Sequence, residues 1–135
     1  MQYLKLLLDT HTLLWAIGKT DELSEKVIHE LKNASNEILV SAVSLWEIAL
    51  KHSLGKLIIS FDAKNIPDYC KSMGFELIPL KALTALNSLR LPQKDNHKDP
   101  FDRMLIYQSI INGYTLVSRD AKIKVYEEDG LKYIW

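Results

Sequence analysis

Short apolar runs alternate along the chain with longer segments in which apolar residues recur at helical spacing. Residues 3–8 and 37–42 are near-continuous apolar runs, a pattern typical of strands that are covered on both faces. Residues 75–80 and 114–118 predict two more strands, and residues 131–135 predict an edge strand.

Helical segments are expected between these runs. The first covers residues 10–18, and the second starts after an N-cap at Ser24. The others are expected at residues 44–55, 66–74 and 81–91, from Asp99 to Gly113, and as a short helix within 119–128. A polar loop is expected at residues 92–99. Strands that alternate with helices predict an α/β sandwich with a mostly parallel central sheet.

Length and composition favour a single domain over residues 1–135, because 135 residues with 47% hydrophobic side chains can build one core. The 17 basic and 17 acidic residues cancel, which argues against binding a polyanion by bulk charge, although a local basic rim is compatible. Cys70 is the only cysteine, so an intramolecular disulfide and a cysteine-based zinc site are excluded. The lone cysteine fits a reducing cytoplasm. Because no apolar run reaches the about 18 residues that a membrane span needs, we expect a soluble protein without a membrane partner.

Four acidic residues fall where a parallel sheet binds its ligands. Asp9 directly follows the first strand, and Asp120 follows the strand at 114–118 by two residues. Glu47 and Asp102 are expected in the first turns of their helices. Because ligands bind beyond the carboxyl ends of parallel strands, we expect these carboxylates to converge on one crevice.

Each acid also has a structural interpretation. Ser44 and Glu47 fit a capping box, a purely structural arrangement at a helix start. Asp99 fits an N-cap before Pro100, and Asp102 would then lie where the helix dipole favours an anion. Taken together the acids are more informative, because close carboxylates repel by roughly 4 kcal/mol per pair at an intermediate dielectric. Such a cluster needs a cation or bound protons.

Oxygen ligands without thiolates suit a hard divalent ion, here Mg²⁺ or Mn²⁺. Thr10 and Ser118 are placed to hydrogen-bond the acids, although either could instead cap its own turn. The four histidines are not spaced as the ligands of a metal site. His29 is interpreted as a solvated helix residue. The sequence does not decide whether His11, His52 and His97 belong to the polar surface or to the rim of the site. A cation in this site would favour hydrolysis of a phosphodiester bond.

Four motifs in order, "LLLDTHTLLW", "VSAVSLWEIALK", "DPFDRMLI" and "LVSRD", resemble those of a PIN-domain ribonuclease, and more narrowly the VapC toxins of bacterial toxin–antitoxin pairs. The resemblance covers nearly the whole chain, with no diagnostic motif at residues 56–90. It implies a three-layer α/β/α sandwich and a metal-dependent endoribonuclease that forms a dimer and is inhibited by a cognate antitoxin. The four family acids match Asp9, Glu47, Asp102 and Asp120, with Asp99 left as a capping or supporting residue.

The mechanism that we expect has Asp9 and Asp102 holding the cation most directly, while Glu47 and Asp120 orient water molecules. Water rather than a ribose 2′-hydroxyl would attack phosphorus, so the products would carry a 5′-phosphate and a 3′-hydroxyl. Basic residues that flank the acids are candidates for RNA phosphate contacts, although solvated surface is the commoner role. These are Arg103, Arg119, Lys122 and Lys124. Trp15 and Trp46 are interpreted as core or interface residues before base-stacking ones.

Two alternatives remain. An aspartyl-phosphate phosphatase also places an aspartate after a parallel strand, but it needs a second aspartate where this sequence has His11. A catalytically silent PIN-like domain, which only binds RNA or a partner protein, is the stronger alternative because sequence alone does not reveal turnover.

Overall fold

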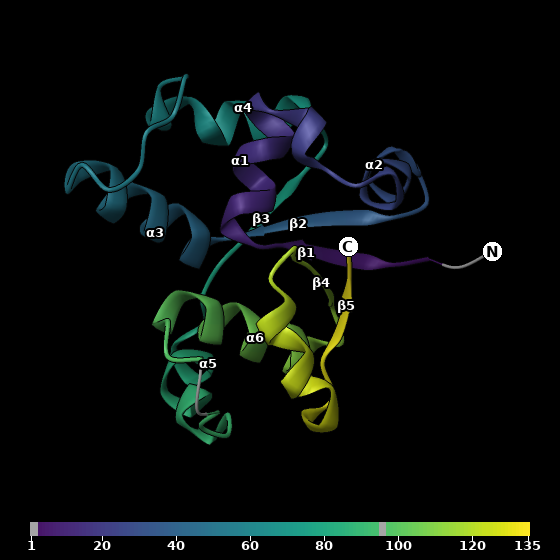
Figure 1. The fold of residues 1–135 in the computed structure, drawn as a ribbon, viewed down its shortest axis with the longest axis vertical. Coiled ribbons are helices and arrows are strands. Elements are labelled where there is room, and N and C mark those ends of the chain that lie inside the picture. Colours follow the sequence, from purple (N-terminus) through teal and green to yellow (C-terminus); the bar gives the residue numbers. More distant parts are fainter. Residues whose placement is uncertain (1–2, 95–96) are drawn as a thin grey trace.

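The computed structural model describes residues 3–94 and 97–135, in which a five-stranded sheet carries helices on both faces (Figure 1). All neighbouring strands are parallel, in the order β3-β2-β1-β4-β5. The strands are β1 (Lys5–Leu8), β2 (Glu37–Ser41), β3 (Glu76–Ile78), β4 (Thr115–Val117) and β5 (Lys132–Ile134). The predicted three-layer α/β/α sandwich is therefore confirmed, with strands shorter than the apolar runs that predicted them.

The helices follow the predicted order. They are α1 (Thr10–Gly18), α2 (Glu25–Lys32), α3 (Ala42–Ser53), α4 (Ile66–Ser72), α5 (Ala82–Asn87) and α6 (Pro100–Asn112). Short 3₁₀ helices are η1 (Thr20–Glu22), η2 (Ala63–Asn65), η3 (Ser88–Arg90) and η4 (Ala121–Asp129). The predicted polar loop at 92–99 includes residues 95 and 96, which lie outside the described residues. Within the described ranges, no helix combines the length and apolarity that crossing a membrane requires.

Predicted caps are present at two helices. The Ser24 side chain accepts a hydrogen bond of 3.1 Å from the Val27 amide at the start of α2. At α6, Asp99 is the N-cap, and Gly113 ends the helix in the left-handed conformation that favours glycine.

The start of α3 differs from the prediction. The helix begins at Ala42 rather than Ser44, because the side chain of Ser41 accepts a 3.0 Å hydrogen bond from the Val43 amide and caps the helix directly at the end of β2. The alternative interpretation of Ser44 and Glu47 as a capping box is therefore excluded. Glu47 lies in the second turn of α3, away from the free amides of the helix start.

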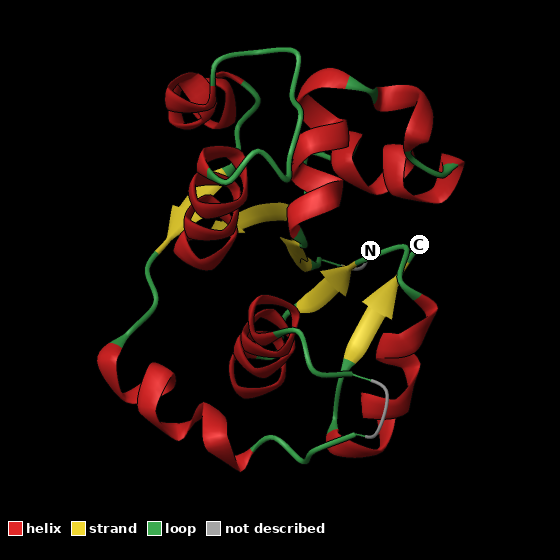
Figure 2. Cartoon of the chain, turned by 60° about the vertical axis from the view of Figure 1, so that its left-hand side comes forward, coloured by secondary structure: helices red, strands yellow, loops and turns green. Residues whose placement is uncertain are grey.

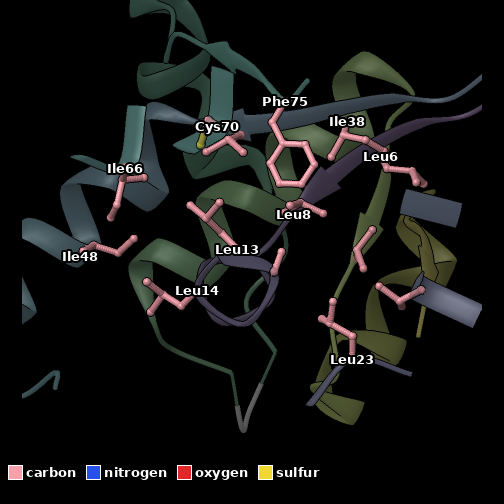
Figure 3. Packing of buried hydrophobic residues seen from close by; sticks show 14 residues of the cluster. Leu6, Leu8, Leu13, Leu14, Leu23, Ile38, Ile48, Ile66, Cys70 and Phe75 are labelled. Atoms are coloured by element: carbon pink, nitrogen blue, oxygen red, sulfur yellow. The ribbon is translucent and has the colours of Figure 1, made fainter. Parts of the chain in front are cut away.

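The two faces of the sheet build separate hydrophobic clusters, because successive side chains of a strand point to opposite faces. Leu6 and Leu8 of β1 pack in a cluster with Leu13 of α1, part of which is drawn in Figure 3. Leu7, between them, packs on the other face with Leu105 of α6. Figure 2 shows the strands lying between the two sets of helices.

The segment predicted to be helical at 81–91 forms α5 and η3, but its apolar side is not covered. Leu83, Leu86 and Leu89 are 70%, 65% and 76% exposed. The spacing of these leucines therefore predicts the helix correctly. Their side chains form an apolar surface on the outside of the protein.

Strand β1 lies at the centre of the sheet, with β2 on one side and β4 on the other. This is a topological switch point, where the connections leave the sheet in opposite directions and a crevice opens beyond the strand ends. The ends of β1 and β4 are tied together, because the Asp9 amide donates a 3.1 Å hydrogen bond to the carbonyl of Val117. The fold thereby places the residues that follow these two strands beside each other.

Candidate active site

A cavity of about 420 Å³ opens beyond the ends of β1 and β4. Three of the four predicted acids line it, namely Asp9, Asp102 and Asp120. The other lining residues are Ser118, apolar side chains of α6, β4 and η4, and a rim of larger polar and aromatic side chains: Leu105, Ile106, Leu116, Ile123, His11, Trp15 and Arg119. The predicted convergence of these three acids at the switch point is therefore present in the structure.

Asp9 is oriented from two directions. It caps α1, with its Oδ1 atom accepting a 2.9 Å hydrogen bond from the Thr12 amide. Burial raises the pKa of Asp9, while hydrogen bonds from Ser118 and Thr12 lower it in part. These opposing effects on the pKa are expected for a carboxylate at the edge of a core, because burial disfavours its charged form and hydrogen bonds favour it.

Glu47 is nearly enclosed, with only 3% of the residue exposed, and it does not line the cavity. The Thr10 hydroxyl donates a hydrogen bond to its Oε1 atom, and Lys51 forms an ion pair with its Oε2 atom one turn further along α3. Thr10 therefore supports an acid, as one of the two interpretations of the sequence held. The sequence predicted that the amides of a helix start would stabilise the Glu47 carboxylate. The side chains of Thr10 and Lys51 stabilise it instead.

Asp102 lies in the first turn of α6, as predicted. Its pKa is raised to about 7, first by burial and then by the negative charges of four other carboxylates. These four are Asp99, Glu47, Asp9 and Asp120. The folded chain therefore brings the other three predicted acids, and Asp99, within electrostatic reach of Asp102.

Asp99 and Ser118 have local partners that explain their positions. Asp99 Oδ1 accepts hydrogen bonds of 2.9 and 3.0 Å from the amides of Phe101 and Asp102, which makes it the cap of α6. The Ser118 hydroxyl accepts a 3.1 Å hydrogen bond from the Asp120 amide, in addition to its contact with Asp9. Ser118 thus links the acids that follow β1 and β4, and Asp99 fixes the helix that carries Asp102.

Asp120 begins the last 3₁₀ helix. Its Oδ1 atom accepts a 2.9 Å hydrogen bond from the Lys122 amide, so the side chain caps η4 at the mouth of the cavity. The capping bond holds one carboxylate oxygen, while the same residue lines the cavity.

His97 lies beside the acids. The sequence left open whether this residue belongs to the polar surface or to the rim of the site. Ligand-capable atoms of His97, Asp102 and Asp120 all lie within 4.8 Å of one another. The residue is only 4% exposed, and burial is the main cause that lowers the pKa of His97. Its place in the polar loop just before Asp99 was the available signal, whereas His29 and His52 are exposed and His11 stands at the rim of the cavity.

The flanking basic residues have three kinds of surroundings. The Arg103 guanidinium donates hydrogen bonds to the carbonyls of Leu91 and Pro92, at 2.9 and 3.0 Å, and so fastens the loop before α6. Arg119 instead lines the cavity, with its guanidinium carbon 5.4 Å from the centre of the Trp15 ring. Lys122 and Lys124 are exposed.

The two tryptophans also differ. Trp15 lines the cavity and packs against Trp135 with ring centres 5.8 Å apart. Trp46 is 62% exposed and meets Phe101 edge-on at 5.1 Å, so it is a surface residue rather than a core residue.

The sequence matches the PIN domain over residues 6–129. Solved structures give similar folds. A chain of VapBC2 from Rickettsia felis, bound to a DNA fragment from their promoter, has a TM-score of 0.66 and 22% identity over 98% of this chain and 99% of that chain. A chain of DNA-bound VapBC from Salmonella typhimurium has a TM-score of 0.62 and 18% identity over 97% of each chain. For a chain of FitAcB from Neisseria gonorrhoeae these values are 0.60 and 13% over 96% of each chain.

No curated protein sequence matches the chain. The family match nevertheless extends from β1 to η4 and so includes every element that carries an acid of the site. The similar structures confirm the sandwich fold. This chain belongs to the PIN-domain family.

Proposed function

We propose that this chain is a divalent-metal-dependent endoribonuclease and the toxin of a toxin–antitoxin pair. The observation that carries the proposal is the convergence of Asp9, Asp102 and Asp120 on one cavity, where burial and then the neighbouring carboxylates raise the pKa of Asp102 to about 7. A structural core has no use for such repulsion, whereas a site that takes up a cation does. Family membership supports a nuclease, since PIN domains are generally nucleases.

The residues present fit a hard divalent cation. Asp9, Asp102 and Asp120 would hold Mg²⁺ or Mn²⁺, because carboxylate oxygens are the ligands that both ions accept. A bound cation of this kind activates water and neutralises charge on a phosphoryl oxygen.

The remaining residues position the acids and the substrate. Thr10 and Lys51 hold the Glu47 carboxylate from two sides, and we assign Glu47 to supplying negative charge beside Asp102 from behind the cavity wall. Arg119 at the cavity rim is the basic residue best placed to meet an RNA phosphate. Because water is the nucleophile, the products carry a 5′-phosphate and a 3′-hydroxyl.

A protein partner is proposed on separate grounds. The similar chains come from complexes named VapBC and FitAB, and we infer a cognate antitoxin that covers the acidic cavity of this chain. The exposed Leu83, Leu86 and Leu89 support self-association, since contiguous exposed apolar side chains commonly mark an interface. A homodimer joined through α5 and η3 is the assembly that we propose.

Digestion of RNA tests the nuclease directly. Purified protein is incubated with total RNA and Mg²⁺ or Mn²⁺, with and without a chelator, beside Asp9→Asn and the control Asp68→Asn. Asp68 is an exposed acid of α4, so its variant matches the charge change at a distance from the site. Cleavage by wild type and the control, and loss of cleavage with Asp9→Asn or chelator, is expected. RNA left equally intact by every protein favours the alternative of a silent binding module.

A further inference from the structure

Among the described residues, a buried imidazole nitrogen faces the acids and has no hydrogen-bond partner. His97 Nε2 has no hydrogen-bond partner among the described residues, although it is enclosed by the protein and the residue is only 4% exposed. It lies 3.9 Å from Oδ2 of Asp102, which is too long for a hydrogen bond. A buried polar atom that is left unpaired costs about 1–3 kcal/mol, so a ligand for it is expected.

The orientation of the ring is fixed from behind. His97 Nδ1 lies 3.0 Å from the hydroxyl of the fully buried Tyr126, and the two rings meet edge-on at 5.3 Å. The same hydroxyl accepts a 3.1 Å hydrogen bond from Arg103, which the backbone of the preceding loop holds in place. With Nδ1 occupied, Nε2 is the nitrogen left for the site, an arrangement typical of histidines that ligate metals.

The separation of the atoms suits a shared ion. Ligands that each lie about 2.1 Å from one cation are about 3.0–4.2 Å from one another in octahedral geometry. The 3.9 Å between Nε2 and Asp102 falls within this range, and Asp120 completes a set whose atoms all lie within 4.8 Å. Small side-chain adjustments would bring the three onto one ion.

We infer that His97 Nε2 is a metal ligand beside Asp102 and Asp120, and that it makes the site prefer Mn²⁺ to Mg²⁺. The inference rests on the proposed function, which requires a divalent cation in this cavity. Selectivity follows from ligand chemistry, because imidazole binds transition metals well, whereas Mg²⁺ prefers an all-oxygen environment. The Tyr126 hydroxyl acts through His97 as a positioning group.

Pulsed electron paramagnetic resonance of the Mn²⁺-loaded protein tests the nitrogen ligand without using activity. Wild type is compared with His97→Gln and with the control His11→Gln, since His11 is the exposed histidine at the rim of the same cavity. Wild type and the control are expected to show the ¹⁴N coupling of a ligated imidazole, and His97→Gln to lose it. Calorimetric titration should show about tenfold or greater loss of Mn²⁺ affinity in His97→Gln and a smaller loss of Mg²⁺ affinity.

Native protein with ¹⁵N-labelled histidine gives the second measurement, which holds even if His97→Gln does not fold. Replacement of the ¹⁴N coupling by a ¹⁵N coupling supports a histidine ligand, and its persistence in labelled His11→Gln excludes the rim histidine. Mn²⁺ bound without any histidine coupling overturns the inference and leaves the proposed function standing. Failure of wild type to bind either cation overturns both.

Discussion

The Thr10 hydroxyl donates a hydrogen bond to the buried carboxylate of Glu47, which lies 37 positions further along the chain. The contact joins the first residue of α1 to the middle of α3, and Thr10 also lies 3.1 Å from the hydroxyl of Ser44. The buried Glu47 carboxylate therefore depends on Thr10, the residue next to Asp9, for one of its hydrogen bonds.

Replacing Thr10 by valine keeps the shape of the side chain and removes the donor. Thr10→Val is expected to lower the free energy of unfolding by about 1–3 kcal/mol, because a buried charged acceptor loses a partner. Nuclease activity should fall about tenfold or more, as is typical when a group that supports an active-site carboxylate is lost. Urea denaturation and the RNA digest measure the two effects. Thr10→Ser retains the hydroxyl and should retain most of both; equal behaviour of Val and Ser would contradict the assigned role.

The raised pKa of Asp102 predicts how stability depends on pH. Its pKa moves from an ordinary 3.8 to about 7 on folding in the absence of a cation, through burial and the surrounding carboxylates. Between these values the folded state binds a proton that the unfolded state releases, so stability decreases as pH rises through the window.

Urea denaturation in chelator between about pH 4 and pH 7 checks this sign by comparing wild type with Asp102→Asn, which cannot titrate. The stability of wild type relative to the variant is expected to fall steadily as pH rises. A constant difference across the window would show that burial and the surrounding carboxylates do not raise the pKa of Asp102.

The uncovered leucines predict self-association. The double variant Leu83→Ser, Leu86→Ser is expected to sediment as a monomer at concentrations where wild type is a dimer, because it removes apolar area from the proposed interface. Ile58→Ser is a suitable control, since Ile58 is 95% exposed on a different segment. Sedimentation velocity measures all three proteins. A monomeric wild type, or a double variant that remains dimeric, would refute this interface.

Much of the site followed from the sequence, because strand ends are readable from apolar runs and parallel strands share one ligand-binding edge. Asp9 and Asp120 were located in this way, and Asp99 and Asp102 were located by the proline at the start of their helix. Each of these signals is local in the chain.

What the sequence did not predict depended on contacts between distant segments. The predicted position of Glu47 in the first turn of its helix was wrong, because Ser41 both ends β2 and caps α3. A pattern of apolar residues does not reveal such a cap. His97 was left open because its burial depends on Tyr126, 29 positions away. Arg103 was a candidate for phosphate contacts, whereas folding directs it to two carbonyls of the preceding loop.

Calorimetric titration of Mn²⁺ into the cation-free protein is the most direct test that the converging acids share a divalent ion. We expect saturable binding by wild type and by Asp68→Asn. In Asp102→Asn and Asp120→Asn, the affinity for Mn²⁺ is expected to be about tenfold lower than in wild type, or lower still. Absence of binding, or equal affinity in all four proteins, would contradict the account.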